Sequence, residues 1–171
     1  MTYNIHPIFV HFPIVLLLIY SFIKIIPFDK WFPNVSWKHI ERVFLLLGVL
    51  GAYMASYTGE IAEDLVQTNE SLLKAHSTFA SISIWFYSLL LLGELISVFN
   101  PIILSKFSLP KTNTLLLFIQ KILTQPILSK ILAFLGLISI SVTGLLGGVM
   151  VFGTSADPLA SIILKILGID F

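Results

Sequence analysis

The sequence contains no cysteine and few charged residues, and both shortages exclude classes of protein. Without cysteine the chain cannot form a disulfide, an iron–sulfur cluster or a thiolate-bound zinc site. Only 11% of its 171 residues are charged, whereas soluble domains carry about 25%. The net charge of +1 also argues against nucleic acid, which needs a clustered basic face. The composition therefore predicts an integral membrane protein with the lipid bilayer as its surroundings.

Long apolar runs make up most of the chain, which is 57% hydrophobic. A helix needs about 20 mostly apolar residues to cross about 30 Å of hydrocarbon. Four stretches meet this need, at approximately 7–26, 40–57, 75–99 and 131–152. We find no internal repeat and no linker that would divide the chain. We therefore predict an all-α membrane protein in which residues 1–171 form a single membrane domain, a four-transmembrane-helix bundle.

Two further apolar stretches are too short or too interrupted to span. Lysines and prolines interrupt residues 101–130, within which we interpret 112–124 as an amphipathic helix lying in the interface. A second interfacial helix is predicted at 158–167, with Asp157 as its N-cap and Gly168 as its end. We also expect the second span to end at Thr58-Gly59, where glycine can adopt a left-handed cap.

The basic residues are distributed unevenly across the predicted topology. Four spans place both termini on one side, side A, and the connections 27–39 and 100–130 on the other, side B. Only Lys74 and Lys165 fall on side A, and the other eight of ten basic residues fall on side B: Lys24, Lys30, Lys38, Arg42, Lys106, Lys111, Lys121 and Lys130. The positive-inside rule makes side B cytoplasmic. We expect a multi-pass protein of the bacterial inner membrane with periplasmic termini.

The same topology gathers chemically unusual residues at side A. His6 and His11 open the first span, Glu60 follows the second, His76 opens the third, and Gly147-Gly148 ends the fourth. Ionisable side chains at the edge of a bilayer are costly to place and are functional candidates. Each also has a structural interpretation, as a helix cap, a packed histidine or a residue of a solvated loop. His39 lies alone on side B.

Three chemistries fit this set of residues, and their spacing does not choose among them. One haem b can be held between axial histidines, for which we select His11 and His76, with His6 as substitute and Gly147 and Gly148 beside the cofactor. Alternatively, zinc, copper or iron binds directly to a set of four side chains: His6, His11, His76 and Glu60.

The third chemistry uses no cofactor and makes the histidines and Glu60 a protonatable site for quinone or proton handling. His6 and His11 are five residues apart, about 140° around a helix. Both can serve one site only if the start of the first span is not helical.

The order of these motifs resembles an uncharacterised bacterial family of short four-span membrane proteins with a domain of unknown function. The resemblance extends over nearly the whole chain and rests on HPxxVHFP at 6–13, Thr58-Gly59, His76 and TGxxGGxxV at 143–151. It implies a membrane protein, and some members are joined to cytochrome c-type modules, which implies a redox setting. Many members carry a histidine directly after the final Thr-Gly, where this chain has Leu145.

Our leading hypothesis is a membrane redox protein that binds one haem b, or a redox metal, near its periplasmic face. It would transfer electrons in or beside a cytochrome-linked or quinone-linked complex, with a c-type cytochrome as a candidate partner. We expect no stand-alone catalytic activity. The alternative is a cofactor-free accessory subunit, which packs its glycine faces against a larger membrane complex.

Overall fold

The computed structural model describes residues 5–63, 68–106 and 110–170, and their side chains except at 100–106 and 110–113. Every element in these ranges is helical, as predicted. In chain order they are α1 (His6–Ile25), α2 (Phe28–Trp31), α3 (Trp37–Glu63), α4 (Glu70–Lys106), α5 (Pro110–Leu123), α6 (Pro126–Phe152), the 3₁₀ turn η1 (Gly153–Ala156) and α7 (Ala160–Leu167).

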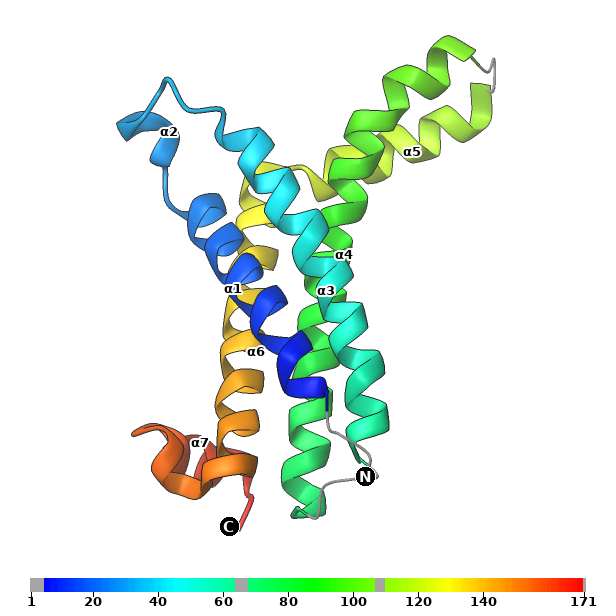
Figure 1. Cartoon of the computed structure of the whole chain (residues 1–171). Helices are drawn as coiled ribbons and strands as arrows, with labels where there is room; N and C mark the ends of the chain where they lie inside the picture. Colours follow the sequence, from blue (N-terminus) through cyan, green and yellow to red (C-terminus); the bar gives the residue numbers. More distant parts are fainter. Residues whose placement is uncertain (1–4, 64–67, 107–109, 171) are drawn as a thin grey trace.

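Four of these helices are long and apolar enough to cross a membrane: α1, α3, α4 as far as Phe99, and α6 with η1. They form a bundle in which α1 packs on α3 and α6, and α4 packs on α6 and α3. The beginning of α1 and the C-terminal α7 lie at one end of the bundle, and α2 and α5 lie at the other (Figure 1). The predicted four-helix arrangement is confirmed, and the two ends are called side A and side B below.

Two helix boundaries differ from the prediction because neighbouring helices support a longer helix. α3 passes through Gly59 to Glu63, so the predicted cap at Thr58-Gly59 is wrong. Gly59 keeps a negative φ, and the continuation buries Ala62. α4 continues past the expected stop at Asn100-Pro101 to Lys106, because α5 packs along this part of the helix and tertiary packing overrides local preference.

The last span begins at Pro126 rather than near residue 131. The side chain of Gln125 accepts a hydrogen bond from the Leu128 N–H at 3.2 Å and so caps the helix. Proline is compatible with the first turn because its missing N–H would have no partner there. A proline that had been interpreted as an interruption is therefore the start of α6.

The middle of the bundle contains a junction of two tyrosines and a serine. The rings of Tyr20 and Tyr87 meet edge to face with centroids 6.1 Å apart. The hydroxyl oxygens of Ser21 and Tyr87 are 2.8 Å apart and share a hydrogen bond. Gly136 lies beneath the Tyr87 ring, where an added Cβ would come within 2.9 Å of Cζ. This glycine therefore allows α6 to approach α4 closely.

A second apolar cluster lies at side A, where α7 folds against α4 and α6. Its buried residues are Leu72, Leu146, Val149, Ala160, Leu164 and Ile169. α7 begins at Ala160, slightly later than predicted, and Asp157 accepts a hydrogen bond from the Leu159 N–H at 2.7 Å. Gly168 ends it with a φ of 66°, as expected for a left-handed cap.

We predict that Gly136→Ala destabilises the bundle. The new methyl group must displace the Tyr87 ring, whose hydroxyl is held by Ser21, and overpacking of this kind costs about 1–3 kcal/mol. Thermal unfolding of the detergent-purified protein, followed by circular dichroism, should show a clearly lower midpoint. Gly144→Ala on the same helix is the control, because a Cβ there has no neighbour within 4 Å. Equal midpoints for the two variants would contradict the close packing at Gly136.

Candidate functional site

His6 is held against α3 at side A. Its Nδ1 lies 3.1 Å from the Thr58 hydroxyl, and the ring also hydrogen bonds to the Ala55 backbone. The Thr58 hydroxyl is within 3.0 Å of the Ala55 carbonyl and 3.1 Å of the Met54 carbonyl, to either of which it can donate its single proton. It then accepts a hydrogen bond from the His6 Nδ1–H. The Nδ1–H tautomer of the neutral ring satisfies this contact and carries its lone pair on Nε2.

His76 is held against α6 in a similar way. Its Nδ1–H donates to the Thr143 carbonyl at 3.0 Å, so the lone pair of the neutral ring is again on Nε2. The ring lies over Gly147, where an added Cβ would be 3.3 Å from Cε1. His6 lies over Gly59 at a corresponding distance of 3.2 Å. Each imidazole therefore has a glycine beneath it and a fixed Nδ1.

The two imidazoles lie within electrostatic range of each other. They come from α1 and α4 and are 70 positions apart in the sequence, but the bundle brings them to the same end. The structure therefore places two oriented histidines together at side A, as the topology had suggested.

His11 lies on a different face of α1. Because the helix is regular from His6 onward, the five-residue spacing turns the two rings about 140° apart. The exposed His11 ring donates its Nδ1–H to the Pro7 carbonyl at 2.6 Å. His6 rather than His11 is the histidine in electrostatic range of His76.

The other candidate residues of side A have no described contact with the imidazoles of His6 and His76. Glu60 is exposed on α3, and an added Cβ at Gly148 would meet Ala156 of η1 at 3.6 Å. Leu145 packs beside the second apolar cluster. Among the described residues, no group of three or more His, Cys, Asp and Glu side chains is placed to hold a metal ion.

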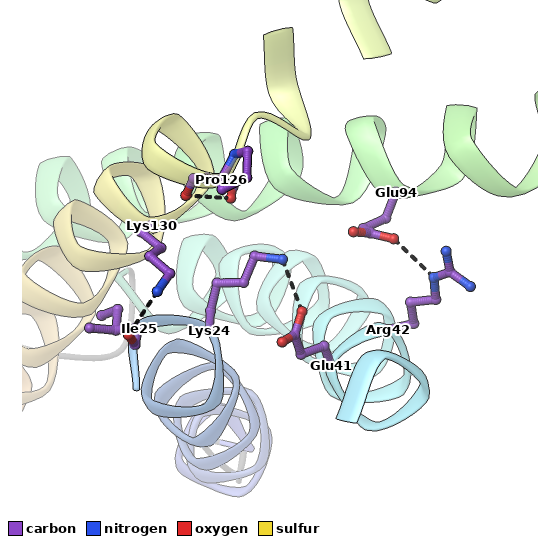
Figure 2. Close-up of polar contacts among 8 residues, drawn as sticks. Lys24, Ile25, Glu41, Arg42, Glu94, Pro126 and Lys130 are labelled. Atoms are coloured by element: carbon purple, nitrogen blue, oxygen red, sulfur yellow. Dashed lines mark hydrogen bonds and ion pairs between the residues drawn. The ribbon is translucent and has the colours of Figure 1, made fainter. Parts of the chain in front are cut away.

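Side B contains a polar cluster that the sequence analysis missed. Lys24 of α1 pairs with Glu41 of α3 at 2.9 Å, and Arg42 of α3 pairs with Glu94 of α4 at 2.9 Å (Figure 2). Lys130 of α6 donates to the Ile25 carbonyl at 3.2 Å. The available signal was the presence of Glu41, Arg42 and Glu94 inside or beside apolar spans, where charges are expensive unless they are paired.

Three residues of these ion pairs, Lys24, Glu41 and Glu94, line a cleft of about 410 Å³ at the end of the bundle. Both carboxylates are largely buried, with 16% of the Glu41 side chain and 15% of the Glu94 side chain exposed. The Tyr20 hydroxyl, which has no hydrogen-bond partner among the described residues, lies in electrostatic range of both. The cleft and this hydroxyl are unusual polar features of the bundle, in addition to the two histidines at side A.

We predict that Arg42 and Glu94 are energetically coupled. Removing one partner leaves a poorly solvated charge, whereas removing both relieves that penalty. Arg42→Gln and Glu94→Gln should each lower the free energy of unfolding, and the double variant should lose less than the sum. A double-mutant cycle on the purified protein should give a coupling of about 0.5–3 kcal/mol. Strictly additive losses would show that the pair contributes nothing.

Comparison with known proteins assigns a family to this architecture. No curated protein and no solved structure matches the chain. A family model described as "Predicted membrane protein (DUF2231)" matches residues 2–156, which include all four candidate spans. The chain belongs to this family of multi-pass membrane proteins of unknown function.

Proposed function

We propose that this protein is a membrane electron carrier that binds one haem b at side A between His6 and His76. The observation that carries the proposal is the pair of imidazoles whose Nδ1 atoms are held by Thr58 and Thr143. Metal-bound histidines almost always donate their second ring N–H to a carbonyl, carboxylate or water, which orients the ring. Here the Nδ1 of His76 meets a backbone carbonyl and the Nδ1 of His6 meets a hydroxyl, so the Nδ1–H tautomer of each ring would present Nε2 to a metal.

The donor set suits haem better than it suits a fully protein-ligated metal. A six-coordinate haem b can be held by two axial imidazoles, and two histidines from different helices lie at the same end of the bundle here, within electrostatic range of each other. Gly59 and Gly147 have no side chain, so each leaves room for the imidazole that packs against it. His6 replaces His11 as the partner of His76 in this proposal, because a regular helix turns His11 away.

When bound, a haem supplies reversible one-electron oxidation and reduction. The protein's own residues would set the ring orientations and limit access of water. Both donors lie at the edge of the apolar bundle, close to the surface on which a partner could exchange electrons. We propose a c-type cytochrome or a quinone-linked complex as that partner.

The orientation follows from the charges at the two ends. Side B contains eight of the ten basic residues, and cytoplasmic connections are enriched in lysine and arginine. We therefore propose a location in a bacterial inner membrane, with side A and both termini facing the periplasm. The haem would then be reached from the periplasm.

The test is the visible spectrum of protein purified in detergent after expression with a haem precursor. We expect a Soret band, with sharp bands after dithionite reduction, at one haem per chain. His6→Ala and His76→Ala should each abolish this six-coordinate spectrum, because each removes an axial ligand. His39→Ala is the control, since His39 lies at the opposite end and should leave the spectrum unchanged.

His11→Ala distinguishes the two possible ligand pairs. Retention of the reduced spectrum in this variant supports His6 as the ligand, whereas loss in His11→Ala and retention in His6→Ala would give the role to His11. A colourless wild-type protein, even after haem is added to the purified sample, would contradict the proposal. Metal analysis of the same sample would then test direct binding of zinc, copper or iron.

A second prediction concerns the glycine beneath His76. Gly147→Val adds a branched side chain where even a Cβ would be 3.3 Å from the ring, so it should displace the imidazole and weaken haem binding. Gly144→Val on the same helix is the matched control, because a Cβ there has open space. Haem titration of the two variants should show weaker binding for Gly147→Val alone. Equal binding would mean that the ring position does not matter.

A further inference from the structure

The cleft at side B is built from charged residues of both signs. Lys24, Glu41 and Glu94 contribute charges that are paired and partly buried, and Asp29 and Lys38 add one exposed charge of each sign. Within the described residues neither Asp29 nor Lys38 has an ion-pair partner. The cleft therefore offers one anionic and one cationic group to a ligand without breaking its internal ion pairs.

A buried hydroxyl within electrostatic range of two carboxylates of the cleft is a second observation. Tyr20 is 1% exposed, and its hydroxyl is unpartnered among the described residues. It lies in electrostatic range of Glu41 and Glu94, both of which line the cleft. Buried polar atoms in native proteins nearly always have a partner. An oxygen or a water brought by a ligand would supply one.

The aromatic residues around the cleft indicate what can reach it. Trp37 lines the cleft, and its indole N–H donates to the Phe32 carbonyl at 3.0 Å. Trp31 and Phe32 are exposed beside it. Tryptophan and other aromatic rings gather at the level of lipid headgroups, so the cleft opens at headgroup depth. Toward the middle of the bundle from this end, α1, α3 and α4 expose apolar side chains such as Phe22, Val43 and Leu95, which suit acyl chains.

We propose that this cleft is a specific site for a phospholipid whose headgroup joins a primary ammonium to a phosphate diester, the phosphatidylethanolamine type. The phosphate would lie against Lys38, and the ammonium would lie against Asp29 and the free oxygens of the two buried carboxylates. A primary ammonium offers three N–H donors, whereas a quaternary ammonium offers none. A purely anionic headgroup would meet Asp29, Glu41 and Glu94 with no positive charge of its own. A zwitterion with hydrogen-bond donors fits this lining best.

The test measures lipid binding to the full chain in detergent by native mass spectrometry. The probes are dioleoyl phosphatidylethanolamine, phosphatidylcholine and phosphatidylglycerol. We expect phosphatidylethanolamine to bind about tenfold more tightly than either of the others, as one charge-assisted contact would give. Equal affinities for the three lipids would overturn the proposal.

Three variants locate the binding site. Lys38→Ala and Asp29→Ala should each remove most of the preference for phosphatidylethanolamine, and both residues are exposed, so the fold should tolerate the changes. Lys30→Ala is the matched control, because this neighbouring lysine does not line the cleft. A preference that survives both cleft variants would overturn the location. Binding of soluble phosphoethanolamine as tightly as the lipid would overturn the assignment to a membrane lipid.

Tyr20→Phe tests the buried hydroxyl separately. Removing an unpartnered hydroxyl should raise the thermal midpoint of the lipid-free protein, because its desolvation is no longer uncompensated. The same change should reduce the additional stabilisation by phosphatidylethanolamine if the bound lipid or its water supplies a partner. Unchanged stabilisation would exclude Tyr20 from the site. The cleft lies at the opposite end from His6 and His76, so haem binding and lipid binding can fail independently.

Discussion

The contact on which the bundle depends most is the one between Tyr87 and its two neighbours. Its ring covers Gly136 of α6, and its hydroxyl shares a hydrogen bond with Ser21 of α1. One side chain of α4 therefore fixes the positions of two other spans in the middle of the bundle. Apolar packing alone gives little specificity between helices in lipid, whereas a glycine contact and a satisfied hydroxyl fix one register. The positions of polar groups at both ends follow from that register.

The two ends solve the problem of polar groups near lipid in different ways. At side A the imidazoles of His6 and His76 bind a hydroxyl and a backbone carbonyl of the adjacent helices. At side B full charges are paired across helices, Lys24 with Glu41 and Arg42 with Glu94. A neutral imidazole that donates its N–H keeps a lone pair on its other nitrogen, whereas paired charges largely neutralise each other. This difference is why we assign a cofactor to side A and a zwitterionic ligand to side B.

The sequence predicted the four spans because length and hydropathy are local properties. It also predicted that histidines and glycines gather at side A, since the topology alone determines which ends meet. From the sequence we selected His11 before His6 as the partner of His76, and that choice depends on whether the first turn is helical, which the regular helix α1 shows it to be. The sequence did not predict that Gly59 lies within a helix: a glycine that admits a neighbouring ring and a glycine that ends a helix look the same in one sequence. The contact with His6 decides between them.

The ion pairs of side B could not have been assigned from the sequence for a related reason. Glu41 and Arg42 are adjacent in the chain, yet one pairs with α1 and the other with α4, because successive residues of a helix point about 100° apart. α3 therefore lies between the two other helices at this end and carries one charge toward each. Any displacement of α3 would strain both pairs together and change the space between Glu41 and Glu94. A ligand that contacts both carboxylates would thus stabilise the position of α3, the same helix that holds His6 through Thr58 at the opposite end.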